Sequence, residues 1–172
     1  MEMTGLFFYM ISVLIAGGIY AVLCLALNVQ WGMGGLFNAG IAGFFAVGAY
    51  ASAIVTTAVS SKHLGGFALP IPFGLVAAMI VAGLTGWVVA KICVRLKSDY
   101  LAMASVGIAE ILRLVIVNES WLTNGSLGIA GVPRPFGDLV QGREADLLYL
   151  GVVWLCVLLV YILCQRLYVS PW

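Results

Sequence analysis

Long apolar runs separated by short polar segments dominate the chain. A helix needs about 20 apolar residues to cross the roughly 30 Å hydrocarbon core of a bilayer. Five runs reach or approach that length, near 6–27, 37–59, 71–93, 101–117 and 147–167. The pattern predicts an all-α integral membrane protein with about five transmembrane helices.

Composition supports this fold class. Hydrophobic residues make up 63% of the 172 positions and charged residues only 9%, whereas a soluble domain carries about 25% charged residues. The formal net charge of +1 gives no electrostatic support for binding nucleic acid. Partners are therefore expected to recognise the chain through packing and shape.

The distribution of basic residues predicts the orientation. Lys91, Arg95 and Lys97 follow the third apolar run, and Arg166 ends the fifth. Because loops rich in Lys and Arg remain in the cytoplasm, both of these ends are expected there. The N-terminus and the long segment 118–146 then lie outside, and the C-terminus is cytoplasmic.

Two of the predicted spans carry small residues at helical spacing. Such stripes let helix backbones approach closely in lipid. Ordinary helix packing and a pore-lining or moving interface both explain them. The residues concerned are Ala42, Ala46 and Ala49 in the second span, and Gly74, Ala78, Ala82 and Gly86 in the third.

Residues for catalysis, metal binding or nucleotide binding do not form a recognisable pattern. The chain has no GxxxxGK[ST] phosphate-binding loop, and its one histidine, His63, has no neighbouring metal ligands in the sequence. The chain is therefore not expected to be an enzyme or to carry a metal or cofactor, and any energy source must come from another subunit.

Glu110 and Arg113 are the only opposite charges in the middle of a predicted span. Charged residues inside a membrane face protein or water, and residues three apart on a helix can reach each other. One interpretation is a mutually neutralising structural pair. The other is a polar element beside a solute pathway.

Two further segments are candidates for function. The stretch NVQWGMGGLFNAG, from Asn28 to Gly40, interrupts two apolar runs and contains Asn28, Gln30 and Asn38. It is either a cytoplasmic turn or a broken helix that presents backbone groups to a solute. The segment 118–146 is long and rich in Gly and Pro, which favours a contact-making loop over an idle one. Its candidate contact residues are Gly125, Ser126, Gly128, Gly131 and Pro133.

Three stretches together resemble a known family. They are LALNVQWGMGGLFNAGIAGFFAVGAYASA, then RLKSDYLAMASVGIAEILRLVIVNESWLTNGSLGIAGVPRP, and finally RLYVSP. In this order they are similar to the branched-chain amino acid ABC transporter permeases of the LivM type, and the likeness covers nearly the whole chain.

The resemblance implies a permease subunit of an ATP-driven importer in a bacterial-type plasma (inner) membrane. Its partners would be a second homologous permease, two cytoplasmic ATPases that bind the ATP, and an extracytoplasmic solute-binding protein. The Gly125–Pro135 loop is expected to contribute to the external face, where that protein docks. The solute would be a branched-chain amino acid or a related small polar molecule such as urea, an amide or another amino acid. Because the chain stops at Ser170-Pro171-Trp172, before the expected coupling segment, it is expected to be the N-terminal part of a longer permease.

Two other functions are compatible with the residues. The Gly-rich break and the sparse charge would also suit a passive channel or facilitator. The small-residue stripes and the short length would suit a membrane assembly subunit that does not itself transport.

Overall fold

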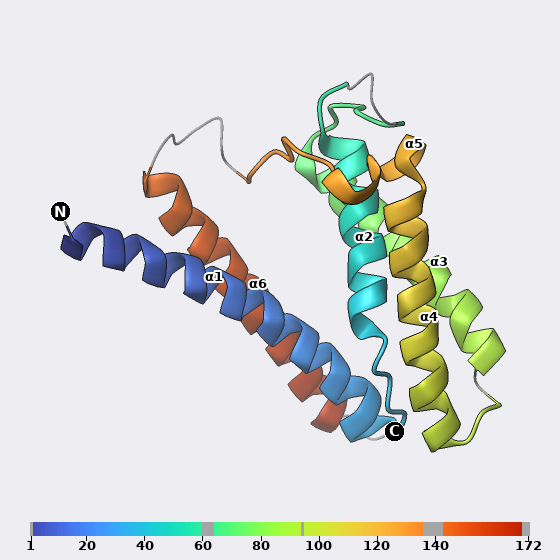
Figure 1. Ribbon diagram of the computed structural model, residues 1–172. Coiled ribbons are helices and arrows are strands. Elements are labelled where there is room, and N and C mark those ends of the chain that lie inside the picture. Colours follow the sequence, from blue (N-terminus) through green and yellow to red (C-terminus); the bar gives the residue numbers. More distant parts are fainter. Residues whose placement is uncertain (1, 60–63, 94, 136–142, 170–172) are drawn as a thin grey trace. The chain divides into compact units, whose positions relative to one another are not determined.

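The computed structural model describes residues 2–59, 64–93, 95–135 and 143–169, without the side chains of residues 2–4, 98 and 143 (Figure 1). Helices dominate this part of the chain, and none of its residues forms a strand. The chain divides into two compact units. Met1–Gly35 and Arg134–Trp172 form one, here called the terminal unit, and Leu36–Pro133 form the other, here called the central unit. The predicted all-α class is confirmed.

The terminal unit is a pair of long helices, α1 (Glu2–Asn28) and α6 (Arg143–Val169). They pack along their lengths and run in the same direction (Figure 1). Gly18 allows a close approach, because a Cβ added there would lie 2.5 Å from Cγ1 of Val153.

In the central unit, α2 (Ile41–Thr56) packs against both α3 (Ile71–Cys93) and α4 (Ser98–Asn118). Glycines of α2 make these contacts close. A Cβ added at Gly43 would lie 2.9 Å from Cα of Ala109 in α4, and one at Gly48 would lie 3.5 Å from Cβ of Ala82 in α3. Backbone proximity, more than bulky side chains, therefore holds α2 between its neighbours.

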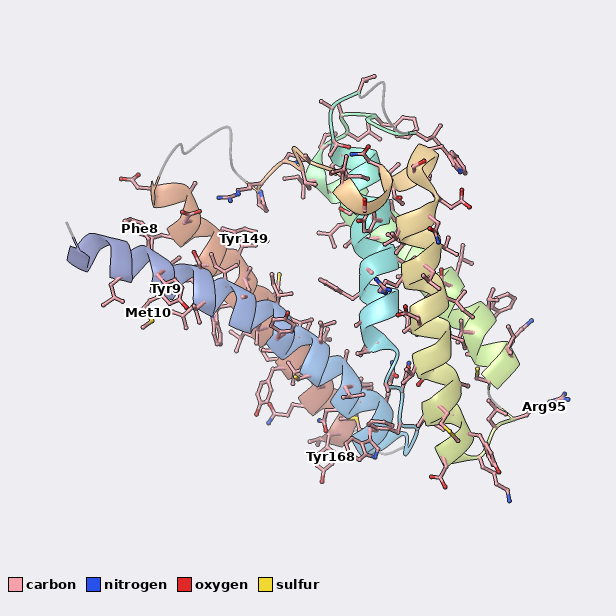
Figure 2. The ribbon with its side chains drawn as sticks, in the orientation of Figure 1. Phe8, Tyr9, Met10, Arg95, Tyr149 and Tyr168 are labelled. Atoms are coloured by element: carbon pink, nitrogen blue, oxygen red, sulfur yellow. The ribbon has the colours of Figure 1, made fainter. Side chains whose placement is uncertain are left out.

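Four helical segments are long and apolar enough to cross a membrane: Gly5–Met33, Ile71–Cys93, Asp99–Asn118 and Glu144–Val169. At most 11% of the most apolar window in each is buried within the chain, so these helices need lipid or further protein around them. The chain is therefore a multi-pass membrane protein. Figure 2 places Tyr9 and Tyr149 near the starts of α1 and α6, and Tyr168 near the end of α6, as expected for rings at a membrane boundary.

The second predicted span differs from its prediction. Residues 37–59 were expected to form one helix, but α2 has only 16 residues. At about 1.5 Å per residue it is roughly 24 Å long, shorter than the hydrocarbon core. The helix begins only at Ile41, after a non-helical segment that follows the positive φ of Gly35, and it ends before Thr57, whose backbone is extended.

The connections beyond α2 and α4 are held by specific hydrogen bonds. Past the end of α2, the N–H of Gly66 donates to the carbonyl of Ile54 at 2.9 Å, and that of Ala68 to Thr57 at 3.0 Å. Past the end of α4, a short helix α5 (Ser120–Thr123) leads into a 3₁₀ turn (Gly125–Leu127). The described loop residues at this end of the central unit are therefore tied to the end of α2 by backbone hydrogen bonds.

Candidate functional site

The polar stretch after α1 is first a helix and then a turn. The helix passes into a π-helical turn at Val29–Met33, closed by a 3.2 Å bond from the N–H of Gly34 to the carbonyl of Val29. The backbone then leaves helical geometry until Ile41. A π turn is uncommon and often marks a functional site. Asn28 and Gln30 lie on the helical side of this break in the terminal unit, and Asn38 lies beyond it in the central unit.

The start of α2 is anchored on α4. The amide of Ala39 donates to Oγ of Ser105 at 3.0 Å, and that hydroxyl donates to the carbonyl of Ala102 at 2.8 Å. Oδ1 of Asn38 accepts from the N–H of Gly40 at 2.9 Å. Because Ser105 is only 4% exposed, these bonds fix the irregular segment at a buried point of the central unit.

Glu110 and Arg113 form a forked ion pair on α4. Nε of Arg113 donates to both carboxylate oxygens of Glu110, at 3.1 and 2.9 Å, and Nη2 donates to Oε1 at 2.8 Å. The side chains of Arg113 and Glu110 are 63% and 52% exposed. The predicted pairing along one helix is confirmed, and the described residues of the central unit leave the pair more than half exposed.

The pair belongs to the side of α4 that does not touch α2. We call this side the outer face of α4, and it comprises the exposed residues Met103, Gly107, Glu110 and Arg113. Among the described residues of the central unit, no atom lies within 4 Å of a Cβ added at Gly107. Since α4 is long enough to span a membrane and the pair lies near its middle, water or another protein must cover this face.

The second ion pair among the described residues lies in the terminal unit. Nη1 of Arg134 donates to Oδ1 of Asp146 at 2.8 Å, close to the start of α6. Both side chains are exposed, so the contact stabilises little. This exposed ion pair can serve as a control in experiments on the Glu110–Arg113 pair of α4.

The Gly-rich loop after α5 has a defined backbone. Asn124 adopts the left-handed conformation with a φ of 64°, and its Nδ2 donates to the carbonyl of Gly128 at 2.8 Å. Gly125 is buried, while Ser126 is exposed at the tip. Gly131 and Pro133 continue the loop as exposed residues. The loop therefore presents a pre-formed surface.

An apolar groove of about 650 Å³ runs between α1 and α6. Asn28 lies at this groove, together with Cys24 and Tyr161. The predicted pathway residue Asn28 therefore borders an apolar surface within the terminal unit.

The small residues of the two predicted stripes differ in how closely other parts of the chain pack against them. Gly74 is buried against Ser52 and Thr56, and Ala78 and Ala82 lie near Gly48. Gly86 has no neighbour within 4 Å of an added Cβ. In α2, Ala42 and Ala49 are exposed and Ala46 is half-buried.

Sequence reasoning missed Ser105 and the glycines that contact α4. The bond between Ala39 and Ser105 joins residues 66 positions apart, which no local pattern reveals. Gly40 and Gly43 were a possible signal, because glycines three apart at a helix start permit a close crossing. His63 and Ser170–Trp172, which the sequence analysis considered, lie outside the described residues.

Comparison with known proteins identifies related transporters. Residues 9–172 match a family model described as the permease component of the branched-chain amino acid transport system. Permease proteins called LivM of the high-affinity branched-chain amino acid transport systems of Escherichia coli and Salmonella typhimurium are each 36% identical over 118 residues. That alignment covers 68% of this chain and 26% of each relative.

An archaeal relative extends the match. A probable branched-chain amino acid transport permease protein of Methanocaldococcus jannaschii is 25% identical over 184 residues, covering 90% of this chain and 51% of the relative. No solved structure matches the chain. The aligned part thus spans between about a quarter and a half of the relatives' length, and the relatives are transport permease components and not enzymes.

Proposed function

Because the chain belongs to the branched-chain amino acid transport permease family, we propose that it is a transmembrane permease subunit of an ATP-driven importer for small polar solutes. The solute is a branched-chain amino acid or a chemically related molecule. In this proposal the outer face of α4 borders the path that the solute takes.

The ion pair on α4 is the observation that carries the proposal. A forked Arg–Glu pair in the middle of an apolar helix is costly in lipid, and its cost falls sharply beside water. Its own central unit leaves both side chains more than half exposed. A water-filled path along the outer face of α4 satisfies both conditions.

The proposed orientation places the starts of α1 and α6 outside and their ends in the cytoplasm of a bacterial-type inner membrane. Basic residues at the connection from α3 to α4 support it, and Figure 2 shows the side chain of Arg95 extending away from that connection. The loop around Ser126 is then extracytoplasmic, where a solute-binding protein docks. In this orientation α2 also crosses the membrane, in addition to the four helices that are long enough to do so. The irregular residues before α2 span the part of the bilayer that this helix is too short to cross.

The proposed assembly contains a second homologous permease, two cytoplasmic ATPases that bind ATP, and the binding protein. In it, Asn28, Gln30 and Asn38 flank the break between α1 and α2 along the chain and are proposed members of its polar network. Irregular backbone at membrane depth is tolerated where it lines a cavity or meets protein. The bond from Ala39 to Ser105 keeps this break in place.

Uptake into proteoliposomes tests the function. The vesicles contain the two permeases and the two ATPases, together with binding protein loaded with tritiated L-leucine. They are expected to accumulate the labelled leucine only when ATP is present. An assembly with a hydrolysis-defective ATPase should show no accumulation, because the chain has no nucleotide site of its own in its sequence.

Vesicles containing this chain alone provide the second arm of the uptake experiment. They should stay impermeable to leucine if the chain is an importer subunit. Passive leucine flux through the chain alone would instead establish a facilitator and contradict the proposal.

A further inference from the structure

The ion pair on α4 leaves one edge of the Arg113 guanidinium unused. Glu110 occupies the Nε–Nη2 edge, with contacts of 2.8 to 3.1 Å. Neither N–H of Nη1 is hydrogen-bonded to any residue that the structure describes. A guanidinium can hold two carboxylates at once, one on each edge. The Nη1–Nη2 edge is therefore open to a second acceptor while Glu110 keeps the plane oriented.

The chemistry of this edge selects its ligand. Two parallel N–H donors match the two oxygens of a carboxylate and form a bidentate pair. Urea and amides offer a single carbonyl oxygen and cannot form both bonds at full strength. The open edge therefore favours a carboxylate-bearing solute over the neutral solutes.

The net charge of the ion pair with a bound ligand narrows the class of ligand further. Glu110 and Arg113 together are neutral, so a simple anion bound to them would leave a net negative charge near the middle of a membrane-spanning helix. A solute that carries its own ammonium group restores neutrality. The site is thus suited to a zwitterion.

The outer face of α4 also has room for a bound molecule. Gly107 lies about one turn before Glu110 on the same face, and no described atom of the central unit comes within 4 Å of the position of its missing Cβ. A solute whose carboxylate engages Arg113 can therefore lie against the helix backbone at Gly107 without displacing a side chain.

From these observations we infer that Arg113 binds the carboxylate of a zwitterionic amino acid through Nη1 and Nη2. Glu110 is a positioning residue that orients the guanidinium and cancels its charge. The inference rests on the proposed function and adds to it the residue that contacts the carboxylate of the solute and the residue that orients that contact.

Binding of tritiated L-leucine to the assembled permeases and ATPases in nanodiscs, without the binding protein, tests this inference. Unlabelled leucine should displace the label, while leucinamide, which lacks the carboxylate, and isocaproate, which lacks the ammonium, should each compete at least about tenfold more weakly. Arg113→Gln and Arg113→Lys should each weaken leucine binding by about tenfold or more, since neither keeps the fork. Arg134→Gln removes the exposed ion pair with Asp146 and should leave binding unchanged.

Glu110→Gln supplies a readout that a merely structural pair would not move. With Arg113 no longer neutralised, the requirement for an ammonium should disappear, so the preference for leucine over isocaproate should shrink or reverse. All variants are compared at equal amounts of assembled protein.

Three results would overturn the inference: no saturable leucine binding to the wild-type assembly, leucinamide competing as well as leucine, or unchanged binding by Arg113→Gln. Failure of the proposed function looks different, because the wild-type assembly would then lack ATP-driven uptake. Normal uptake together with unchanged binding by Arg113→Gln would refute only the role of this residue.

Discussion

Gly40→Val is expected to prevent stable assembly of the central unit. A Cβ at this position overlaps the backbone carbonyl oxygen of Ser105, which cannot move aside as a side chain would. The clash also separates Ala39 from Ser105 and breaks the bond that fixes the start of α2. Overpacking costs about 1–3 kcal/mol in ordinary cores, and a clash with backbone in α4 should reach or exceed that range.

The amount of monodisperse protein extracted from membranes measures this effect. Gly48→Ala, within α2, is the control, because its Cβ would lie in ordinary contact, 3.5 Å from that of Ala82. Gly86→Ala, with open space around it, should also match the wild type. A normal yield of Gly40→Val would mean that α2 does not dock on Ser105.

Removing one charge from the pair on α4 is expected to reduce the amount of assembled protein severalfold. Glu110→Gln leaves a cation, and Arg113→Leu an anion, unpaired near the middle of a membrane-spanning helix. Either charge then lacks the counter-ion that neutralises it. The double variant Glu110→Gln/Arg113→Leu should recover the wild-type level, because no charge remains.

Uptake by the double variant separates the two interpretations of the pair. If the pair borders the pathway, the well-assembled double variant should lose most leucine uptake. If the two charges only neutralise each other, uptake by the double variant should stay close to that of the wild type, and the pathway role would have to be abandoned.

The positions of the long helices could be predicted from the sequence, because the apolar runs alone encode them. The apolar runs predicted the helices well at α1, α3 and α6, where each run extends over most of the helix. The prediction was poorest at α2. Apolar residues continue on both sides of it, so hydropathy did not register the positive φ of Gly35 or the extended Thr57.

The candidate site was predictable only where it is local. Glu110 and Arg113 are three residues apart on one helix, so their contact followed from spacing. The anchoring of Ala39 by Ser105 depends on how α2 crosses α4, and no local rule contains that information. The alanine stripe of α2 was likewise an incomplete guide, since the closest backbone contacts are made by Gly40 and Gly43.

A solute path along α4 requires that water reach the outer face of this helix, and the reactivity of a cysteine at Gly107 measures this directly. In an assembled transporter whose four native cysteines are replaced by serine, Gly107→Cys should react with a membrane-impermeant thiol reagent at a rate approaching that of the exposed loop variant Ser126→Cys. Saturating leucine should slow the reaction, while the buried control Ser105→Cys stays unreactive. If Gly107→Cys is as unreactive as Ser105→Cys, lipid or packed protein covers the outer face, and the solute does not pass along α4.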